Sequence, residues 1–262
     1  MIDYHVHSSI SADCKVPMMM MAQAAVGAGI KEICFTEHID LNLVEGPDFR
    51  VDFDAYAVAI AGVRAAFPNL VIRMGIEAGL DVNTAPQLSA MLKDQPLDYV
   101  IGSQHVVFGL DPFYENVWKQ YSQADIYGEY LRVSAESVAR IDDFDVMGHI
   151  GYVSKFCPFD DKLLRYADYT DAIDTVLKLL IGKGKGIEVN TNGLYMTPST
   201  MPETAIIKRY FELGGEIVTI GSDAHYESVV GHAVADTLNL LKTIGFRYIC
   251  AFDKRQPLFL PL

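Results

Sequence analysis

Short β-branched apolar runs alternate along the chain with longer stretches whose apolar residues have helical spacing. The runs predict strands at 2–7, 32–36, 71–77, 99–105, 146–149, 186–190 and 217–222. The stretches between them predict helices at 18–29, 54–67, 84–93, 123–141, 170–182, 202–213 and 229–244. Strands separated by helices of this length are typical of βαβ units and a parallel sheet. Seven such units favour an α/β barrel of the TIM type over an open sheet.

No low-complexity segment or Pro/Gly/Ser-rich linker divides the 262 residues, so we expect one domain over 1–262. The longest irregular stretches, 39–51 and 106–122, have the length of functional loops. The amino terminus lacks the pattern of a signal peptide, and no apolar stretch is long enough to span a membrane. The four cysteines are scattered without a C-x-x-C pair, and Cys34 and Cys250 lie in apolar, strand-like runs. We therefore expect buried free thiols and a cytoplasmic protein.

The net charge narrows the class of partner. It is −13, from 21 Lys and Arg against 34 Asp and Glu. Nucleic acid bound over a broad surface needs a basic face, so this balance argues against it. A small phosphorylated substrate stays compatible with an acidic protein if bound metal ions supply a local positive field.

Residues of the metal-ligating types gather where the predicted strands end. The first strand ends in His5-Val6-His7, and strand alternation places both rings on one face, as two nitrogen ligands of one metal require. Six of the seven histidines follow strands, and only His232 lies on a predicted helix. The strand-end set with its acidic members is His5, His7, His38, Glu77, His105, His149, Asp223 and His225. Since the carboxyl ends of barrel strands converge on one site, this placement predicts a polynuclear metal centre.

The chemistry of such a centre follows from its mixed ligands. A central carboxylate can bridge two ions, which lower the pKa of a shared water and hold the oxygens of an anionic substrate. Nitrogen and oxygen ligands together are compatible with Zn, Mn or Fe, and the spacing does not choose among them.

Six motifs, in order along the whole chain, resemble the polymerase and histidinol phosphatase (PHP) family, and most closely its histidinol-phosphate phosphatase branch. They are His5-Val6-His7, Phe35-Thr36-Glu37-His38, Gly75-Ile76-Glu77, Gly102-Ser103-Gln104-His105, Gly148-His149 and Gly221-Ser222-Asp223-Ala224-His225. The resemblance implies a distorted (β/α)7 barrel with a trinuclear site at the carboxyl ends of the strands. It also implies hydrolysis of L-histidinol phosphate in histidine biosynthesis, by attack of a metal-bound hydroxide on phosphorus.

Carried over by position, the resemblance implies three divalent ions. The first would be held by His5, His7, Glu77 and Asp223. The second would be held by His105 and His149 and would share Glu77 with the first. The third would be held by Asp13, His38 and His225, with Asp13 standing where some family members have His.

The resemblance and the neighbouring residues also suggest contacts to substrate. The family pattern after Gly148-His149 has an acidic residue, here Gly151, and then a basic-aromatic pair, here Lys155-Phe156. Lys155 is therefore the expected phosphate contact.

Four further residues are candidates beside it. Asn190 and Asn192, at the end of the sixth predicted strand, are candidate hydrogen-bonding groups for the substrate. Asp40 is a candidate donor of the proton to the leaving oxygen, and His225 is a second candidate catalytic residue.

Three other interpretations stay open. The first is a PHP phosphoesterase acting on nucleotides or oligonucleotide ends. The second is a TatD-like nuclease or an amidohydrolase, which would not need His38 and His225 as a third metal position. The third is a non-catalytic metal-binding protein, against which the complete ligand set argues. The sequence leaves a homo-oligomer open.

Overall fold

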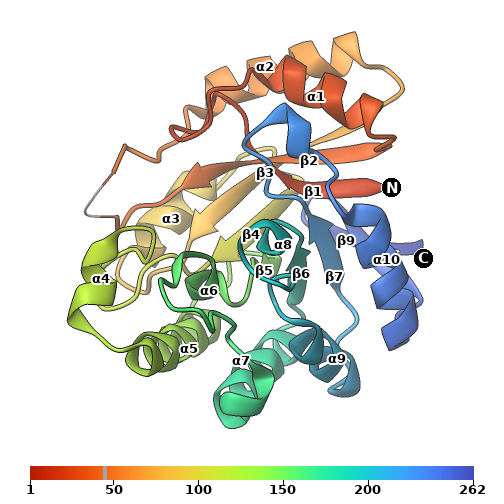
Figure 1. Cartoon of the computed structure of the whole chain (residues 1–262). Helices are drawn as coiled ribbons and strands as arrows, with labels where there is room; N and C mark the ends of the chain where they lie inside the picture. The colour runs from red at the N-terminus through yellow and green to blue at the C-terminus, as the bar shows by residue number, and fades with distance from the viewer. Residues whose placement is uncertain (44–45) are drawn as a thin grey trace.

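Seven parallel strands form one sheet whose order follows the sequence (Figure 1). The computed structural model describes residues 1–43 and 46–262, so part of the predicted 39–51 loop lies outside the described residues. The strands are β1 (Ile2–Val6), β2 (Glu32–Ile39), β3 (Val71–Gly79), β4 (Tyr99–Ser103), β5 (Val146–Met147), β6 (Gly186–Asn190) and β7 (Val218–Gly221). All seven predicted strands are therefore confirmed.

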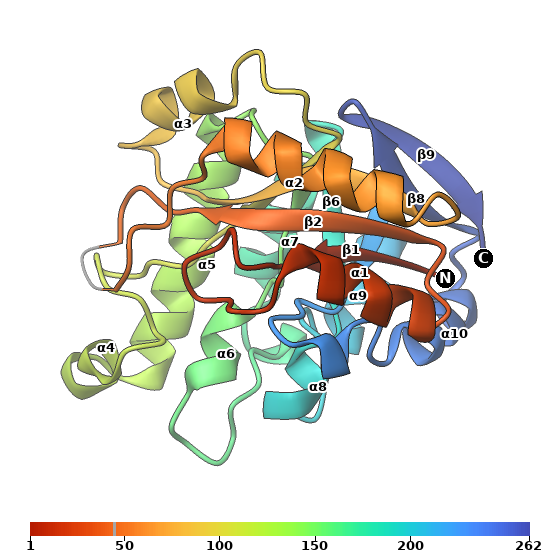
Figure 2. The same cartoon turned by 90° about the horizontal axis from the view of Figure 1, so that it is seen from above.

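The helices cover the outside of this sheet (Figures 1 and 2). The seven predicted helices correspond to α1 (Met18–Gly27), α2 (Phe53–Ala66), α3 (Ala85–Leu92), α5 (Gln123–Arg140), α7 (Thr170–Gly182), α9 (Thr204–Glu212) and α10 (Val234–Ile244). Three short helices were not predicted: α4 (Glu115–Gln120), α6 (Tyr152–Phe156) and α8 (Gly193–Met196). Two 3-10 turns, η1 (Tyr166–Asp168) and η2 (Glu227–Val229), complete the set. In the chain, α4, α6 and α8 follow β4, β5 and β6, and α6 carries Lys155.

The sheet is nearly closed into a barrel, because the end of β1 meets the segment after β7. The Asp223 amide donates to the His5 carbonyl at 2.7 Å, and the His7 amide donates to the Ala224 carbonyl at 3.0 Å. The buried Asp3 carboxylate reinforces this seam by accepting the amides of Ser222 and Gly231, both at 2.8 Å. The expected distorted seven-stranded barrel is thus confirmed, and its closure brings His5 and His7 beside Asp223.

An antiparallel hairpin of β8 (Tyr248–Asp253) and β9 (Gln256–Pro261), which was not predicted as an element, covers the amino end of the barrel. Its turn contacts residues that precede the strands: the Arg255 amide donates to the Asp98 carbonyl at 2.9 Å, and Arg255 Nε lies 2.5 Å from Asp145 Oδ2. Figure 2 shows the hairpin at the end of the barrel where the chain begins. Only the carboxyl end is therefore left for a site.

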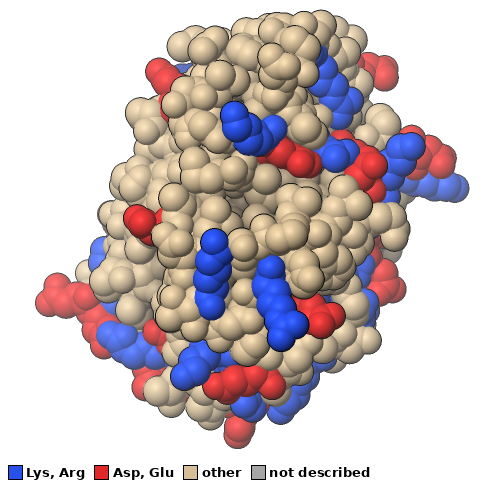
Figure 3. Space-filling model, turned by 90° about the vertical axis from the view of Figure 1, so that its right-hand side faces the viewer, with Lys and Arg blue, Asp and Glu red and all other residues tan. Residues whose placement is uncertain are grey.

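The surface charges and the state of the cysteines agree with the predictions from the sequence. The face in Figure 3 intersperses basic and acidic side chains and shows no continuous basic surface. Cys34 and Cys250 are buried and free, as predicted, and so are the other two cysteines. In the described part of the chain, no helix combines the length and the apolar character that crossing a membrane requires.

Candidate metal centre

The six strand-end histidines converge at the carboxyl end of the barrel. The rings of His5 and His7 are 5.0 Å apart between centroids, and the ring of His7 lies 4.3 Å from that of His38 and 4.2 Å from that of His225. His105 and His149 form a second group, 5.3 Å apart. The convergence predicted from the strand ends is therefore present.

Glu77 lies at the centre of the cluster, opposite His38 in the register of β2 and β3. Its side chain is buried, and its two oxygens face different sets of nitrogens. Oε2 lies 3.0 Å from His5 Nε2, 3.2 Å from His38 Nδ1 and 3.4 Å from His7 Nε2. Oε1 lies 2.7 Å from His149 Nε2 and 3.2 Å from His105 Nε2, and it accepts the Ser103 hydroxyl at 2.7 Å. A carboxylate placed this way has the geometry of a bridge between two cation positions.

Two carboxylates behind the histidines fix how the rings are presented. Glu188 Oε1 lies 2.5 Å from His5 Nδ1, and Asp40 Oδ1 lies 2.9 Å from His105 Nδ1. If each Nδ1 donates its proton to the carboxylate, each Nε2 turns a lone pair towards Glu77, the arrangement of metal-binding histidines. Glu188 also accepts the His149 amide at 2.8 Å. The sequence analysis missed Glu188, although an acidic residue within the buried strand β6 was a usable signal.

Among the described residues, several buried histidine nitrogens have no partner in hydrogen-bonding geometry, although two of them lie close to Glu77 Oε2. They are His7 Nε2, His38 Nδ1 and His149 Nδ1. Leaving a buried polar atom unsatisfied costs about 1–3 kcal/mol, so such atoms usually mark a bound group. His7 Nε2 lies 3.6 Å from Asp223 Oδ1, a separation that a shared cation would bridge. The donor set therefore fits divalent metal ions.

Among the described residues, three groupings of side chains bring one ligand atom from each member within 4.8 Å of the others. They are His5 with His7 and Glu77, His38 with Glu77 and His105, and His7 with His38 and His225. Asp13 joins the third grouping, because its Oδ2 lies 3.1 Å from His225 Nε2 and 3.4 Å from His38 Nε2. The Asp13 side chain is 35% exposed, so this grouping lies at the rim of the site.

Two opposing effects determine the pKa values of the carboxylates in the cluster: burial raises them, and nearby positive charges lower them. Burial alone would raise the pKa values of Glu77 and Asp223, but nearby cationic side chains hold both well below their usual range. For Glu77 the lowering comes chiefly from His5 and His38, and for Asp223 from Lys155 and His5. Burial likewise opposes the ionisation of Asp40, and His105 and His38 lower its pKa to about 2. All three carboxylates are therefore anionic at neutral pH, and Glu77 and Asp223 have the charge that binding a metal ion requires.

Two of the predicted substrate residues, Lys155 and Asn192, contact Asp223, and the other candidates lie deeper in the cluster. Lys155 on α6 places its Nζ 3.2 Å from Asp223 Oδ2, and the Asn192 side chain donates to the Asp223 carbonyl at 3.2 Å. Asn190 is buried and donates to Glu188 Oε2 at 3.2 Å. Asp40 is buried behind His105 and His38. Their contacts to a substrate stay predictions, and the geometry places Lys155 and Asn192 nearer the opening than Asn190 and Asp40.

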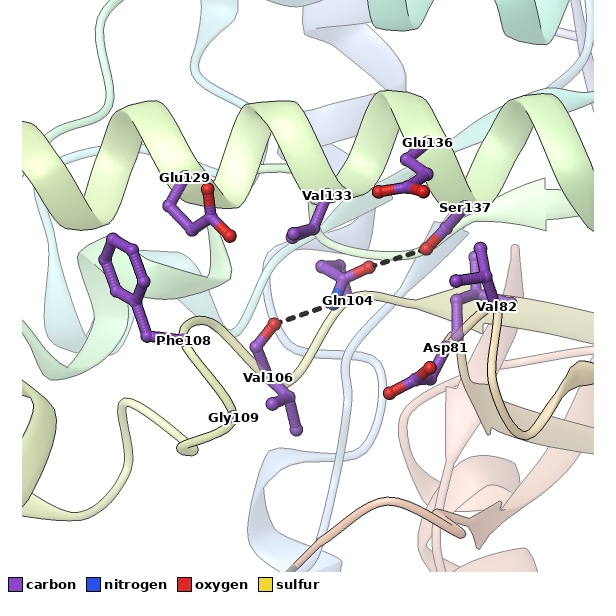
Figure 4. A pocket seen from close by; sticks show the side chains of 11 residues that line it. Asp81, Val82, Gln104, Val106, Phe108, Gly109, Glu129, Val133, Glu136 and Ser137 are labelled. Atoms are coloured by element: carbon purple, nitrogen blue, oxygen red, sulfur yellow. Dashed lines mark hydrogen bonds between the residues drawn. The ribbon is translucent and has the colours of Figure 1, made fainter.

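A cavity of about 130 Å³ lies elsewhere, between α5 and the ends of β3 and β4 (Figure 4). Gln104 spans it by accepting the Ser137 hydroxyl and donating to the Val106 carbonyl. None of the candidate site residues lines this cavity. The metal cluster, and not this cavity, is therefore the candidate site.

Comparison with known proteins gives one consistent family. The PHP domain profile matches residues 3–192. A Clostridium acetobutylicum protein named "Probable histidinol-phosphatase" is 32% identical over 97% of both chains, and the histidinol-phosphatase of Lactococcus lactis is 29% identical over 96% of this chain and 94% of its own. The crystal structure of a Lactococcus lactis histidinol phosphate phosphatase, complexed with zinc, L-histidinol and phosphate, superposes with a TM-score of 0.92 at 27% identity over 98% of each chain.

Proposed function

The chain belongs to the PHP domain family, and from that premise we propose that it hydrolyses L-histidinol phosphate with three divalent ions held by its histidine–carboxylate cluster. It is a histidinol-phosphatase-like, metal-dependent phosphatase. The observation that supports the proposal most directly is the position of Glu77, whose two oxygens face separate sets of histidine nitrogens. The whole chain also superposes on an enzyme crystallised with zinc, L-histidinol and phosphate.

The proposed ligand sets follow the groupings around Glu77. His5, His7 and Asp223 would hold one ion on the Oε2 side of Glu77, and His105 and His149 would hold a second on the Oε1 side. His38, His225 and Asp13 would hold the third at the rim. His38 also faces Glu77 Oε2, so it could contribute both to the third ion and to the ion on the Oε2 side of Glu77.

When bound, divalent ions polarise phosphate oxygens and lower the pKa of water. The residues of the chain supply position and charge around that chemistry. Lys155, beside Asp223, would hold a phosphate oxygen by a charge-assisted hydrogen bond. Asp40 and Glu188 orient the imidazoles of His105 and His5. Of the two catalytic candidates, His225 at the rim is better placed to reach a leaving group than the buried Asp40.

The geometry of the cluster supports two of the alternative functions less well. A TatD-like or amidohydrolase site would leave the contacts of Asp13 with His38 and His225 without a purpose. A non-catalytic metal-binding role would not need Lys155 at the opening. We further propose a single domain, supported by one barrel core, and a reducing cytoplasmic setting, supported by four free buried thiols.

The decisive experiment is turnover of a small panel of phosphomonoesters by protein reconstituted with Zn²⁺, Mn²⁺ or Fe²⁺. The panel contains L-histidinol phosphate, nucleoside monophosphates and sugar phosphates. We expect the highest kcat/KM for L-histidinol phosphate. Equal or better hydrolysis of nucleotides would refute histidinol phosphate as the specific substrate, but the chain would still be a phosphoesterase. If none of the esters were hydrolysed, both hypotheses would be refuted.

A further inference from the structure

The turn after β1 is held by a buried carboxyl group that belongs to none of the proposed ligand sets. Glu37, on β2, is fully buried and accepts four hydrogen bonds from this turn. Ser8 donates its amide at 3.1 Å and its hydroxyl at 2.5 Å, and Ser11 donates its amide at 3.1 Å and its hydroxyl at 2.6 Å. The segment that leads from His7 to Asp13 is therefore anchored on Glu37.

The Ser11 hydroxyl has a complete set of hydrogen-bond partners. Besides donating to Glu37, its oxygen lies 3.1 Å from the His38 amide nitrogen and 3.4 Å from His7 Nδ1. The amide can only donate, so it occupies one lone pair of the oxygen. The single proton of the hydroxyl goes to Glu37, because the shorter contact, to a carboxyl oxygen, is the stronger one. The second lone pair is left for His7 Nδ1, which must then be the donor.

The position of this proton decides which nitrogen of His7 can bind a metal ion. A neutral imidazole carries one proton, so a proton on Nδ1 leaves a lone pair on Nε2. Nε2 is buried, and in the described part of the chain it has no partner in hydrogen-bonding geometry. It lies 3.4 Å from Glu77 Oε2 and 3.6 Å from Asp223 Oδ1. A lone pair that faces two carboxylate oxygens is favourable only when a cation lies among them.

We propose that Ser11, held by Glu37, is a positioning residue that fixes the tautomer of His7 and thereby strengthens metal binding. The inference rests on the proposed function, because it concerns an ion that His7 would hold there. Glu188 and Asp40 contact the Nδ1 atoms of their histidines directly, whereas Glu37 acts on His7 through a hydroxyl group. Such a partner behind a metal ligand orients the ring and raises the basicity of the ligating nitrogen.

The first test needs no substitution of Ser11. In metal-free protein with isotopically labelled histidine, long-range proton–nitrogen NMR shows which ring nitrogens carry a proton. The signals of His7 are identified by their loss in His7→Gln. We expect a proton on Nδ1 of His7, and a wild-type ring without that proton would overturn the proposal. In Ser11→Ala the tautomer should shift towards a proton on Nε2, because Nδ1 has lost its acceptor.

The second test measures zinc affinity by competition with a chromophoric chelator. Ser11→Ala should weaken zinc binding by about 10–100-fold. Ser8→Ala removes the other hydroxyl that Glu37 accepts and leaves the contact with His7 in place, so its loss should be smaller. The matched control is Ser89→Ala, which removes a serine–carboxylate hydrogen bond to Asp143 outside the cluster and should bind zinc as the wild type does. Wild-type affinity in Ser11→Ala, or an equal loss in Ser8→Ala, would overturn the proposal.

These measurements separate the positioning role from the proposed function. A protein that hydrolyses no phosphomonoester, yet has the proton on His7 Nδ1 and loses zinc affinity in Ser11→Ala, would refute the function and support the positioning role. An active protein whose Ser11→Ala variant binds zinc normally would refute only the positioning role. Circular dichroism shows whether Ser11→Ala folds, and the wild-type NMR spectrum decides the case if it does not.

Discussion

Replacing Glu77 by Gln tests the central feature of the site with little change of shape. The carboxylate lies within 3.4 Å of nitrogens from five histidines and accepts the Ser103 hydroxyl. A glutamine keeps the volume and one acceptor oxygen, but turns an NH₂ group towards one set of histidine nitrogens. The substitution therefore removes the anion that we propose bridges two metal ions, and it should leave the surrounding fold in place.

The size of the effect follows from the charge that is lost. Two unit charges about 4 Å apart interact by about 4 kcal/mol at an effective dielectric constant of about 20. A divalent ion beside Glu77 would lose at least that interaction, which corresponds to roughly a thousandfold in affinity. Because Glu77 faces both of the first two ligand sets, both proposed ions should be affected. The rate on histidinol phosphate should fall by at least the same factor under limiting metal.

The assay has two independent readouts. Metal content after dialysis is measured by inductively coupled plasma mass spectrometry, and phosphate release is measured in the same samples. Circular dichroism shows whether the fold is kept. The control is Glu115→Gln, which breaks only an exposed ion pair with Lys119 and should change neither readout.

Two results would refute the reasoning. A folded Glu77→Gln protein with a normal metal content and full activity would show that Glu77 is not the bridge. A normal metal content with lost activity would show that the carboxylate acts on the substrate and not as a ligand. The expected result is the joint loss of metal and rate.

Three further predictions concern groups around the bridge. Lys155→Ala should raise the KM for histidinol phosphate about tenfold with a smaller change in kcat, measured by steady-state kinetics, and an unchanged KM would contradict the phosphate contact. Glu188→Gln should weaken zinc binding by about 10–100-fold through His5, measured by competition with a chromophoric chelator, and wild-type affinity would exclude the orienting role. Burial lowers the pKa of His105, but the neighbouring Asp40 carboxylate raises it to about 10. The pKa of His105 in the folded state therefore lies above its value in the unfolded state. The metal-free protein should therefore lose stability as pH rises from about 6.5 towards 10, measured as Tm by scanning fluorimetry, and a Tm that rises across this window would contradict the prediction.

The barrel and the convergence of the strand-end histidines could be predicted from the sequence because both follow from local patterns. Strand and helix periods are set by neighbours in the chain, and a residue at a strand end reaches the mouth of the barrel whatever the rest of the fold does. His105 and His149 follow β4 and β5 directly, so their convergence needed no knowledge of the packing. Asp13 lies in a loop, and only the resemblance to the PHP family indicated it.

Features that depend on distant contacts were not predictable in this way. The short helices α4, α6 and α8 are too brief to be stable alone and need tertiary packing. The predicted helix at 229–244 begins only at Val234, because Gly231 and Ala233 adopt left-handed backbone angles, φ of 73° and 52°. This turn lets the Gly231 amide reach Asp3 on β1, a contact across the barrel seam. Glu188 escaped notice for the same reason, since its partner His5 lies 183 residues away.

The charge balance of the site connects the acidic chain with a phosphate substrate. Three divalent ions would bring a formal charge of about +6. The sequence offers three carboxylates as proposed ligands, Asp13, Glu77 and Asp223. The structure adds Asp40 and Glu188 in contact with the histidines, so a charge of about −5 lies within the cluster. With Lys155 included, the pocket is left with about +2, which matches one phosphate dianion. With the three proposed ions bound, a pocket so nearly balanced would attract a single phosphomonoester. It would attract the repeated charges of a nucleic acid backbone only weakly, and the net charge of −13 would repel them.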